Sequence, residues 1–142
     1  MWKEIGEAFR QLGTMGDDCR CILLMGKGKG FCSGIDITDE KFFSGLTLGY
    51  DDSENDTADP ARKSLAFRSQ ILEMQAAFTA VEECPVPVVA AIHGACVGAG
   101  VDLVCCADVR LCSSSAKFSV REVRLGLAAD VLRGPGLSRD RP

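Results

Sequence analysis

The sequence of 142 residues predicts an α/β fold in one domain. Short apolar runs alternate along the chain with longer stretches of helical periodicity, and turns rich in glycine or proline separate them. Hydrophobic residues make up 46% of the chain and charged residues 25%, which is a globular mixture rather than a disordered one. Strands that alternate with helices are typical of α/β organisation.

The first part of the chain predicts a helix, a strand and two loops. A helix is expected over residues 2–12, because apolar residues recur there at helical spacing: Trp2, Ile5, Phe9 and Leu12. The apolar run 21–25 is followed by the glycine-rich residues 26–30, which indicates a buried strand and then a loop. Residues 44–60 are acidic and end at a proline, so we expect a solvated insertion there.

The second part of the chain begins with a long helix over residues 61–83, whose apolar residues lie on or near one face. Residues 86–92 are β-branched or alanine almost throughout, the pattern of a strand buried on both faces. The remaining predicted elements follow in order: a small-residue turn over 94–100, a short apolar helix over 101–106, strands over 109–112 and 117–120, and a loop over 121–131.

Charge and hydropathy argue against several classes of protein. The formal net charge of −4 disfavours a non-specific nucleic-acid binder, which usually carries a basic patch. No apolar run approaches the ~20 residues that a membrane span needs. The start of the chain lacks the regions of a secretory signal, and residues 138–142 are not a peroxisomal address. No targeting signal is therefore visible.

Eight cysteines would suggest a disulfide framework in a small secreted chain, but nothing here indicates secretion. The sequence has no C-x-x-C pair, and His93 is its only histidine, so we expect no structural zinc site. Cys21, Cys105 and Cys106 lie in or beside apolar runs. We expect reduced, buried thiols that act as small hydrophobic residues.

Two glycine loops are candidates for binding a negative charge. Gly94-Ala-Cys-Val-Gly-Ala-Gly100 lies between a predicted strand and a predicted helix, where small residues allow close approach and the first N–H groups of the helix are unpaired. In Phe31-Cys-Ser-Gly-Ile-Asp-Ile37, Gly34 permits a sharp bend after which the N–H of Ile35 could face a ligand. Two backbone donors from separate loops make an oxyanion hole. The alternative is that both segments are structural turns.

Three carboxylates, Asp102, Glu122 and Asp130, follow the second loop. Asp102 lies in an apolar stretch, where an unpaired buried charge is costly, so it faces the surface, pairs with a base such as Arg110, or lines a dry pocket. Asp130 follows five uncharged residues, and paired carboxylates suit proton transfer along a substrate. For Glu122, the flanking arginines also allow an ordinary surface ion pair.

Both loops resemble motifs of the crotonase, or enoyl-CoA hydratase/isomerase, superfamily: F-x-x-G-x-D-[IL] over residues 31–37, and P-V-[IV]-A-A-[IV]-x-G-x-x-x-G-G-G-x-[ED]-L over residues 87–103. The motifs occur in the family's order and spacing. The resemblance implies a partial ββα spiral core over residues 1–131, with 44–60 as an acidic insertion loop. It also implies an acyl-CoA thioester as substrate, with no further cofactor and no metal.

The resemblance assigns the oxyanion hole to the N–H groups of Ile35 and Ala99. Ala99 stands where the family usually has glycine, so this assignment requires that its φ be negative or that alanine tolerate the bend. The implied substrate-binding residues lie in the two loops: Ser33, Gly34, Ile35, Asp36, Ile37, Gly98, Ala99 and Gly100.

The segment 120–131 is similar to that of Δ3,5-Δ2,4-dienoyl-CoA isomerases, whereas hydratases carry Glu in place of Asp102 and Gly in place of Asp130. The resemblance implies that Glu122 and Asp130 move protons between C2 and C6 of a 3,5-dienoyl-CoA, with Asp102 in support. We favour Glu122 at C2. The resemblance further implies a role in the β-oxidation of unsaturated fatty acids, in mitochondria or peroxisomes.

The chain also departs from the family. Family members have strands before the first helix and a helical C-terminal region that closes the pocket and builds homotrimers or hexamers, and we expect both to be absent here. Residues 132–142 show no core pattern and are expected to form a divergent, unstructured tail. One alternative is therefore that the chain has no catalytic activity by itself and acts as an acyl-CoA binder or as a truncated subunit. Enoyl-CoA hydratase or Δ3,Δ2-enoyl-CoA isomerase activity is another, and the acidic balance disfavours an RNA-binding relative.

Overall fold

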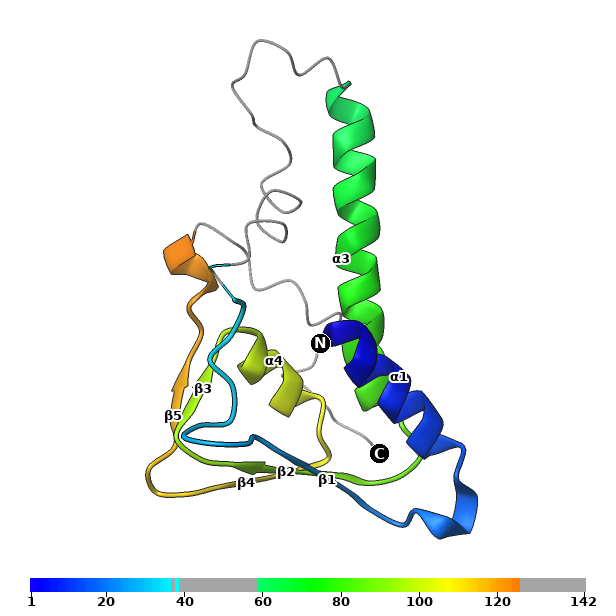
Figure 1. Cartoon of the computed structure of the whole chain (residues 1–142), viewed down its shortest axis with the longest axis vertical. Coiled ribbons are helices and arrows are strands. Elements are labelled where there is room, and N and C mark those ends of the chain that lie inside the picture. Colours follow the sequence, from blue (N-terminus) through cyan, green and yellow to red (C-terminus); the bar gives the residue numbers. More distant parts are fainter. Residues whose placement is uncertain (37, 39–58, 126–142) are drawn as a thin grey trace, which may run out of the picture.

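A small parallel sheet and a second pair of strands meet at a steep angle, and helices fill the space on one side of them (Figure 1). The computed structural model describes residues 1–36, 38 and 59–125. Its elements are, in order, α1 (Trp2–Gly13), η1 (Gly16–Asp18), β1 (Ile22–Met25), α3 (Pro60–Glu82), β2 (Val88–Ile92), β3 (Ala95–Val97), α4 (Ala99–Cys105), β4 (Val109–Cys112), β5 (Lys117–Ser119) and η2 (Glu122–Leu125).

The first sheet has the strand order β1-β2-β4, with all neighbours parallel. Ile22 pairs with Val88, and Val89 pairs with Val109, so β2 is the central strand. The second sheet pairs β3 with β5, also parallel. The predicted α/β organisation is confirmed, and four strands and three helices lie within two residues of the expected ranges.

The sequence predicts a turn over residues 94–100, but the structure differs there. The segment contains β3, and α4 begins at Ala99, two residues before the predicted start of the helix at 101. β3 forms because it pairs with β5, which lies about twenty residues further along the chain, and no local pattern reveals that partner. The predicted loop 121–131 contains the short helix η2, and its residues 126–131 lie outside the described part.

Helices α1 and α3 pack closely against each other. Asp59 caps α3 by accepting a hydrogen bond from the N–H of Ala61 at 3.2 Å, and Pro60 occupies the first turn, where its missing N–H costs nothing. Gly6 of α1 meets the backbone of α3, because a Cβ placed on Gly6 would stand 3.0 Å from the Cα of Ala77. This glycine allows the two helix axes to approach.

The core lies between these helices and one face of the first sheet. Val88, Ala90 and Ile92 of β2 are buried on that face, together with Phe78 and Val81 of α3. Burial of β2 on both faces is not observed, since Val89 and Ala91 are only half-buried. The helices cover one face of the sheet (Figure 1), and the register places four side chains that are 47–62% exposed on the other: Leu23, Met25, Val109 and Leu111.

All eight cysteines are free thiols, and the expectation that they are buried holds for some of them only. Cys96 and Cys106 are buried, whereas Cys21 and Cys112 are exposed, because they adjoin or belong to the edge strands β1 and β4. Burial raises the pKa of the Cys96 thiol to about 11. Within the described ranges, no helix is long and apolar enough to cross a membrane.

Replacement of Gly6 by valine is expected to lower the free energy of unfolding by about 1–3 kcal/mol, because the new side chain must separate α1 from α3. Urea denaturation measures this loss. Ala8→Val is the matched control, since Ala8 lies on the exposed face of the same helix. An equal, small change in both variants would show that the close approach at Gly6 does not limit the packing.

Alkylation of the folded protein at pH 8 is expected to label Cys21 and Cys112 rapidly and to leave Cys96 unmodified. The raised pKa keeps Cys96 protonated until the pH approaches its value of about 11, so its thiolate fraction at pH 8 is roughly 10⁻³. Mass spectrometry of peptides from native and urea-unfolded protein tests this. Rapid native labelling of Cys96 would contradict the buried position of its side chain in β3.

Candidate functional site

The two glycine loops and Glu122 come together at one point of the structure. Gly98 has φ +57 and ψ −130. A Cβ placed there would stand 3.7 Å from the Cα of Gly34 in the first loop and 3.0 Å from Oε1 of Glu122. Gly98 therefore lies close to both Gly34 and the Glu122 carboxylate, with no room for a side chain between them, although these residues lie far apart in the sequence.

The first loop is held in place by pairing with β3. The N–H of Cys32 donates to the carbonyl of Ala95 at 3.0 Å, and the N–H of Val97 donates to the carbonyl of Cys32 at 2.9 Å, which forms an isolated parallel bridge between Cys32 and Cys96. Gly34 follows with φ +93, a conformation that favours glycine. The chain therefore bends directly after the bridge and presents Ile35.

The second loop is fixed by β5 on its other side. The N–H of Gly98 donates to the carbonyl of Ser119 at 2.9 Å, and the carbonyl of Gly98 accepts from the N–H of Val101 at 2.7 Å. Ala99 is consequently the first residue of α4 and is 1% exposed. Its helical conformation gives it a negative φ, which is the condition on which its predicted role depended. An N–H in this position has no acceptor within its own helix.

Ile35 and Ala99, the two predicted donors, each directly follow a glycine, and these two glycines lie against each other. Within the described part of the chain, no hydrogen bond from the N–H of Ile35 to another residue is observed. Side by side, two such donors suit an oxygen that gains negative charge during a reaction. Their role remains a prediction.

Glu122 is the one buried charged residue of the described ranges, with 6% of its surface exposed. It begins η2, directly beyond β5, and its Oε2 has no hydrogen-bond partner among the described residues. The interpretation of Glu122 as part of a surface ion pair with the neighbouring arginines is therefore wrong. Arg121 instead donates from its Nε to Ser119 Oγ at 3.4 Å. A buried carboxylate oxygen without a hydrogen-bond donor is costly, and Oε2 has none among the described residues, which makes Glu122 a candidate for binding a ligand or substrate.

Asp102 lies in the first turn of α4, three residues after Ala99, and its Oδ2 is buried. Arg110, the base considered as its partner, donates from Nη1 to the carbonyls of Ala107 at 2.7 Å and Cys105 at 3.4 Å, where α4 ends. Asp130, the third predicted carboxylate, lies outside the described residues, as does Ile37.

The remaining predicted binding residues belong to the same loops. Ser33 and Asp36 are exposed, and the carboxylate of Asp36 accepts hydrogen bonds from the N–H and the hydroxyl of Thr38 at 2.9 and 2.7 Å. These bonds hold the pKa of Asp36 below its usual value. Asp36 thus stabilises the turn after Ile35. Gly100, in α4, has no room for a side chain, since a Cβ there would stand 2.6 Å from the Cβ of Cys32.

Two residues that contact the loops have no role in the sequence-based interpretation. Ser119 supplies the carbonyl that holds Gly98, and the sulfur of Cys32 accepts the N–H of Gly34 at 3.4 Å. Cys32 lies within the first motif, but a cysteine in a loop has no characteristic pattern of its own. Only the fold brings it next to Gly100.

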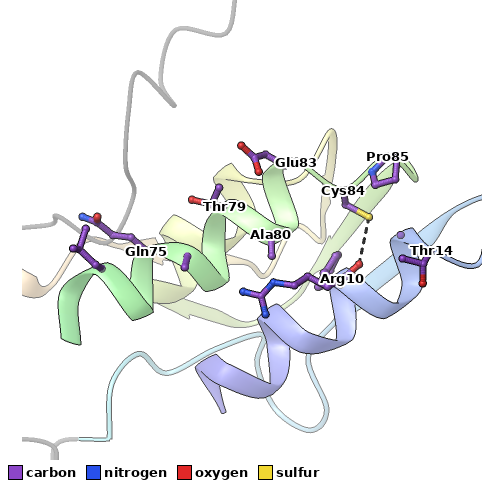
Figure 2. Close-up of a pocket in the computed structure, with 12 residues that line it drawn as sticks. Arg10, Thr14, Gln75, Thr79, Ala80, Glu83, Cys84 and Pro85 are labelled. Atoms are coloured by element: carbon purple, nitrogen blue, oxygen red, sulfur yellow. Dashed lines mark hydrogen bonds between the residues drawn. The ribbon is translucent and has the colours of Figure 1, made fainter. Parts of the chain in front are cut away.

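A groove of about 700 Å³ lies elsewhere, between α1 and α3 (Figure 2). Arg10 lines it from α1 and Thr14 from the residue after that helix. Gln75 and Thr79 line it from α3, and Glu83 from the residue that follows. None of its lining residues belongs to the two loops, and none carries a buried side-chain polar atom that lacks a partner within the described part. The loops with Glu122 are therefore the stronger candidate site.

The fold and the site thus define an α/β protein in which two glycine loops face a buried acid. The sequence profile of the family "Enoyl-CoA hydratase/isomerase" matches residues 1–140. This chain belongs to that family, and the resemblance of its motifs to crotonases is confirmed.

Relatives of this family narrow the similarity further. The chain is 42% identical over 130 residues to the mitochondrial Delta(3,5)-Delta(2,4)-dienoyl-CoA isomerase of Mus musculus, a match over 92% of this chain. It is 47% identical over 114 residues, or 80% of its length, to the peroxisomal Delta(3,5)-Delta(2,4)-dienoyl-CoA isomerase of Arabidopsis thaliana.

A solved structure shares the fold. It is a putative enoyl-CoA hydratase from Thermobifida fusca in complex with acetoacetyl-CoA, with a TM-score of 0.71 and 26% identity over 96% of this chain. The matched region makes up 49% of that protein, and 37% and 38% of the two isomerases. The chain therefore spans between one third and one half of the length of these relatives.

Replacement of Gly98 by alanine is expected to destabilise the fold by about 1–3 kcal/mol from the left-handed backbone alone, and by more because the new methyl group meets Oε1 of Glu122 at 3.0 Å. Gly28→Ala is the matched control: Gly28 also has a positive φ, +98, but nothing lies within 4 Å of its Cβ position. Urea unfolding compares the two. An equal loss of unfolding free energy in the two variants would show that Glu122 does not restrict the side chain at position 98.

Proposed function

We propose that this chain carries the site of a Δ3,5-Δ2,4-dienoyl-CoA isomerase, which converts a 3,5-dienoyl-CoA into the conjugated 2,4-dienoyl-CoA. The observation that carries the proposal is Glu122: a buried carboxylate whose Oε2 has no partner in the described chain and which lies against the second glycine loop at Gly98. The similarity to isomerases of two compartments supports the assignment of the substrate.

The chemistry begins at C2 of the acyl chain. Glu122 removes a proton from C2 while the thioester oxygen, which gains the negative charge, accepts hydrogen bonds from the N–H groups of Ile35 and Ala99. The electron pair from the C2–H bond forms a C1–C2 double bond while the π electrons of the thioester C=O move to its oxygen. When the C=O bond forms again, this pair moves to form the C2–C3 double bond, and the C3–C4 double bond shifts to C4–C5. Removal of one such donor typically costs about 2.7–4 kcal/mol of transition-state stabilisation.

The second proton transfer takes place at C6. The electrons of the original C5–C6 double bond take up a proton there, so the product has double bonds at C2 and C4 and the same number of atoms. We assign this proton to Asp130 from the motif alone, because Asp130 lies outside the described residues. Two separate acid–base groups are needed, since C2 and C6 lie too far apart for one carboxylate to serve both.

Asp102 has a supporting place in this proposal. Its backbone lies one turn from Ala99 and its Oδ2 is buried, so its charge contributes to the field at the start of α4. The reaction only relocates a proton and two double bonds, and we propose that it needs no metal and no cofactor apart from the CoA of the substrate. We further propose a mitochondrial or peroxisomal setting, the compartments named for the two isomerases.

The assay is the appearance of the conjugated diene from 3,5-octadienoyl-CoA, followed by absorbance. Glu122→Gln is expected to reduce kcat by about 10²–10⁴, because a positioned acid–base group contributes that factor. Asp17→Asn is the control, since it neutralises an exposed carboxylate in η1. Wild-type activity in Glu122→Gln would contradict the assignment.

Asp130→Asn separates the isomerase from a hydratase. It is expected to abolish dienoyl isomerisation and to leave any hydration of a 2-enoyl-CoA nearly unchanged, because only the former needs a group at C6. The same assays are run on a version of the chain extended to the full length of its relatives. Turnover by the extended version alone would identify this chain as an inactive acyl-CoA binder or subunit, and turnover by neither would refute the isomerase proposal.

A further inference from the structure

Cys32 occupies the junction between the two donor loops. Its backbone forms the parallel bridge to Cys96, with the N–H directed to Ala95 and the carbonyl accepting from Val97. Two residues after it comes Gly34, and three residues after it comes Ile35. Its strand partner Cys96 likewise lies two residues before Gly98 and three before Ala99. The bridge therefore lies at equal sequence distance from both predicted donors.

The side chain of Cys32 fills the space that Gly100 leaves open. A Cβ on Gly100 would stand 2.6 Å from the Cβ of Cys32 and 3.0 Å from its sulfur, both closer than side-chain atoms tolerate. The thiol thus rests directly on the first turn of α4, whose first residue is Ala99. The distance between the first loop and this turn therefore depends on the Cys32 sulfur and on the lack of a side chain at Gly100.

The sulfur also holds the Ser33–Gly34 peptide, one peptide before the one that carries the Ile35 N–H. The N–H of Gly34 donates to Sγ of Cys32 at 3.4 Å, and Gly34 keeps φ +93. This bond fixes the orientation of the chain at the residue before the Ile35 donor. Sulfur is a weak acceptor but a large atom, so it can meet Gly34 and Gly100 together.

We propose that Cys32 is a positioning residue, which sets the spacing and orientation of the Ile35 and Ala99 N–H groups through its contacts with Gly34 and Gly100. The identity of the oxygen bound by these donors rests on the function proposed above. The positioning itself does not depend on that function, so the two can be tested apart.

Four variants separate the two contacts. Cys32→Ala loses the acceptor and the volume, Cys32→Val keeps the volume without the acceptor, and Cys32→Ser keeps an acceptor in a smaller side chain. Cys112→Ala removes an exposed thiol at the end of β4 and is the control.

Amide hydrogen exchange, measured by NMR on the chain without ligand, tests the geometry. In Cys32→Ala and Cys32→Val, exchange at Gly34 is expected to become about threefold to tenfold faster, the factor that one hydrogen bond is worth. Cys32→Ser is expected to restore part of the protection, and β2 is expected to keep its wild-type rates. Unchanged exchange at Gly34, or equally faster exchange throughout β2, would overturn the proposal, because the latter indicates a general loss of stability.

Kinetics with 3,5-octadienoyl-CoA and the affinity for acetoacetyl-CoA test the consequence. Cys32→Ala and Cys32→Val are expected to lower kcat by about tenfold or more with KM within about threefold, because misplaced donors weaken transition-state binding chiefly. A kcat equal to that of Cys112→Ala would overturn the proposal and leave the isomerase function intact. If the wild type neither binds nor turns over these thioesters, the proposed function fails for this chain, and hydrogen exchange alone decides the positioning.

Discussion

The structure of the site depends on the two-sided pairing of β3. This strand pairs with β5 on one side over three residues, and on the other side Ala95 and Val97 bond to Cys32. Each pairing delivers one part of the site: β5 leads into Glu122, Cys32 leads into Gly34, and β3 itself leads into Gly98. Because all three segments leave the strands in the same direction, a parallel arrangement brings their following residues together. An antiparallel partner would send one of them away.

The burial of Glu122 follows from this arrangement and from the shape of glycine. A side chain at Gly98 would occupy the space in which Oε1 lies, and the positive φ makes that position unfavourable for other residues. Among the described residues Oε2 of Glu122 has no partner, at a place where apolar packing would be more stable. Such local conflicts between stability and residue type are expected where a protein retains groups for function.

Much of the fold could be predicted from the sequence, because periodicity and chain breakers act locally. The stripe from Trp2 to Leu12 and the apolar face of residues 61–83 predict helices that the structure contains. β3 could not be predicted, since Ala95, Cys96 and Val97 form a strand only through partners elsewhere in the chain. The same reason explains the sheet face at Leu23 and Leu111, whose exposure depends on where the helices pack.

The candidate site divides in the same way. The loops around Gly34 and Gly98 are visible in the sequence because their conformation restricts the residue type. The burial of Glu122 was hidden by the arginines beside it, which would also suit a surface position. The contacts of Cys32 were hidden because a thiol acts here through its size and through a weak acceptor, and neither property produces a pattern in a single sequence.

The apolar face formed by Leu23, Met25, Val109 and Leu111 has a practical consequence for spectroscopy. Environment-sensitive dyes such as ANS become fluorescent on exposed apolar surface, and their signal is widely taken as a sign of a molten globule. A native molecule with this face uncovered presents such a surface without any loss of side-chain packing. For this chain, dye fluorescence therefore arises from the exposed sheet face even when the core is intact. Near-UV circular dichroism, which depends on side-chain packing, is the better measure of an intact core.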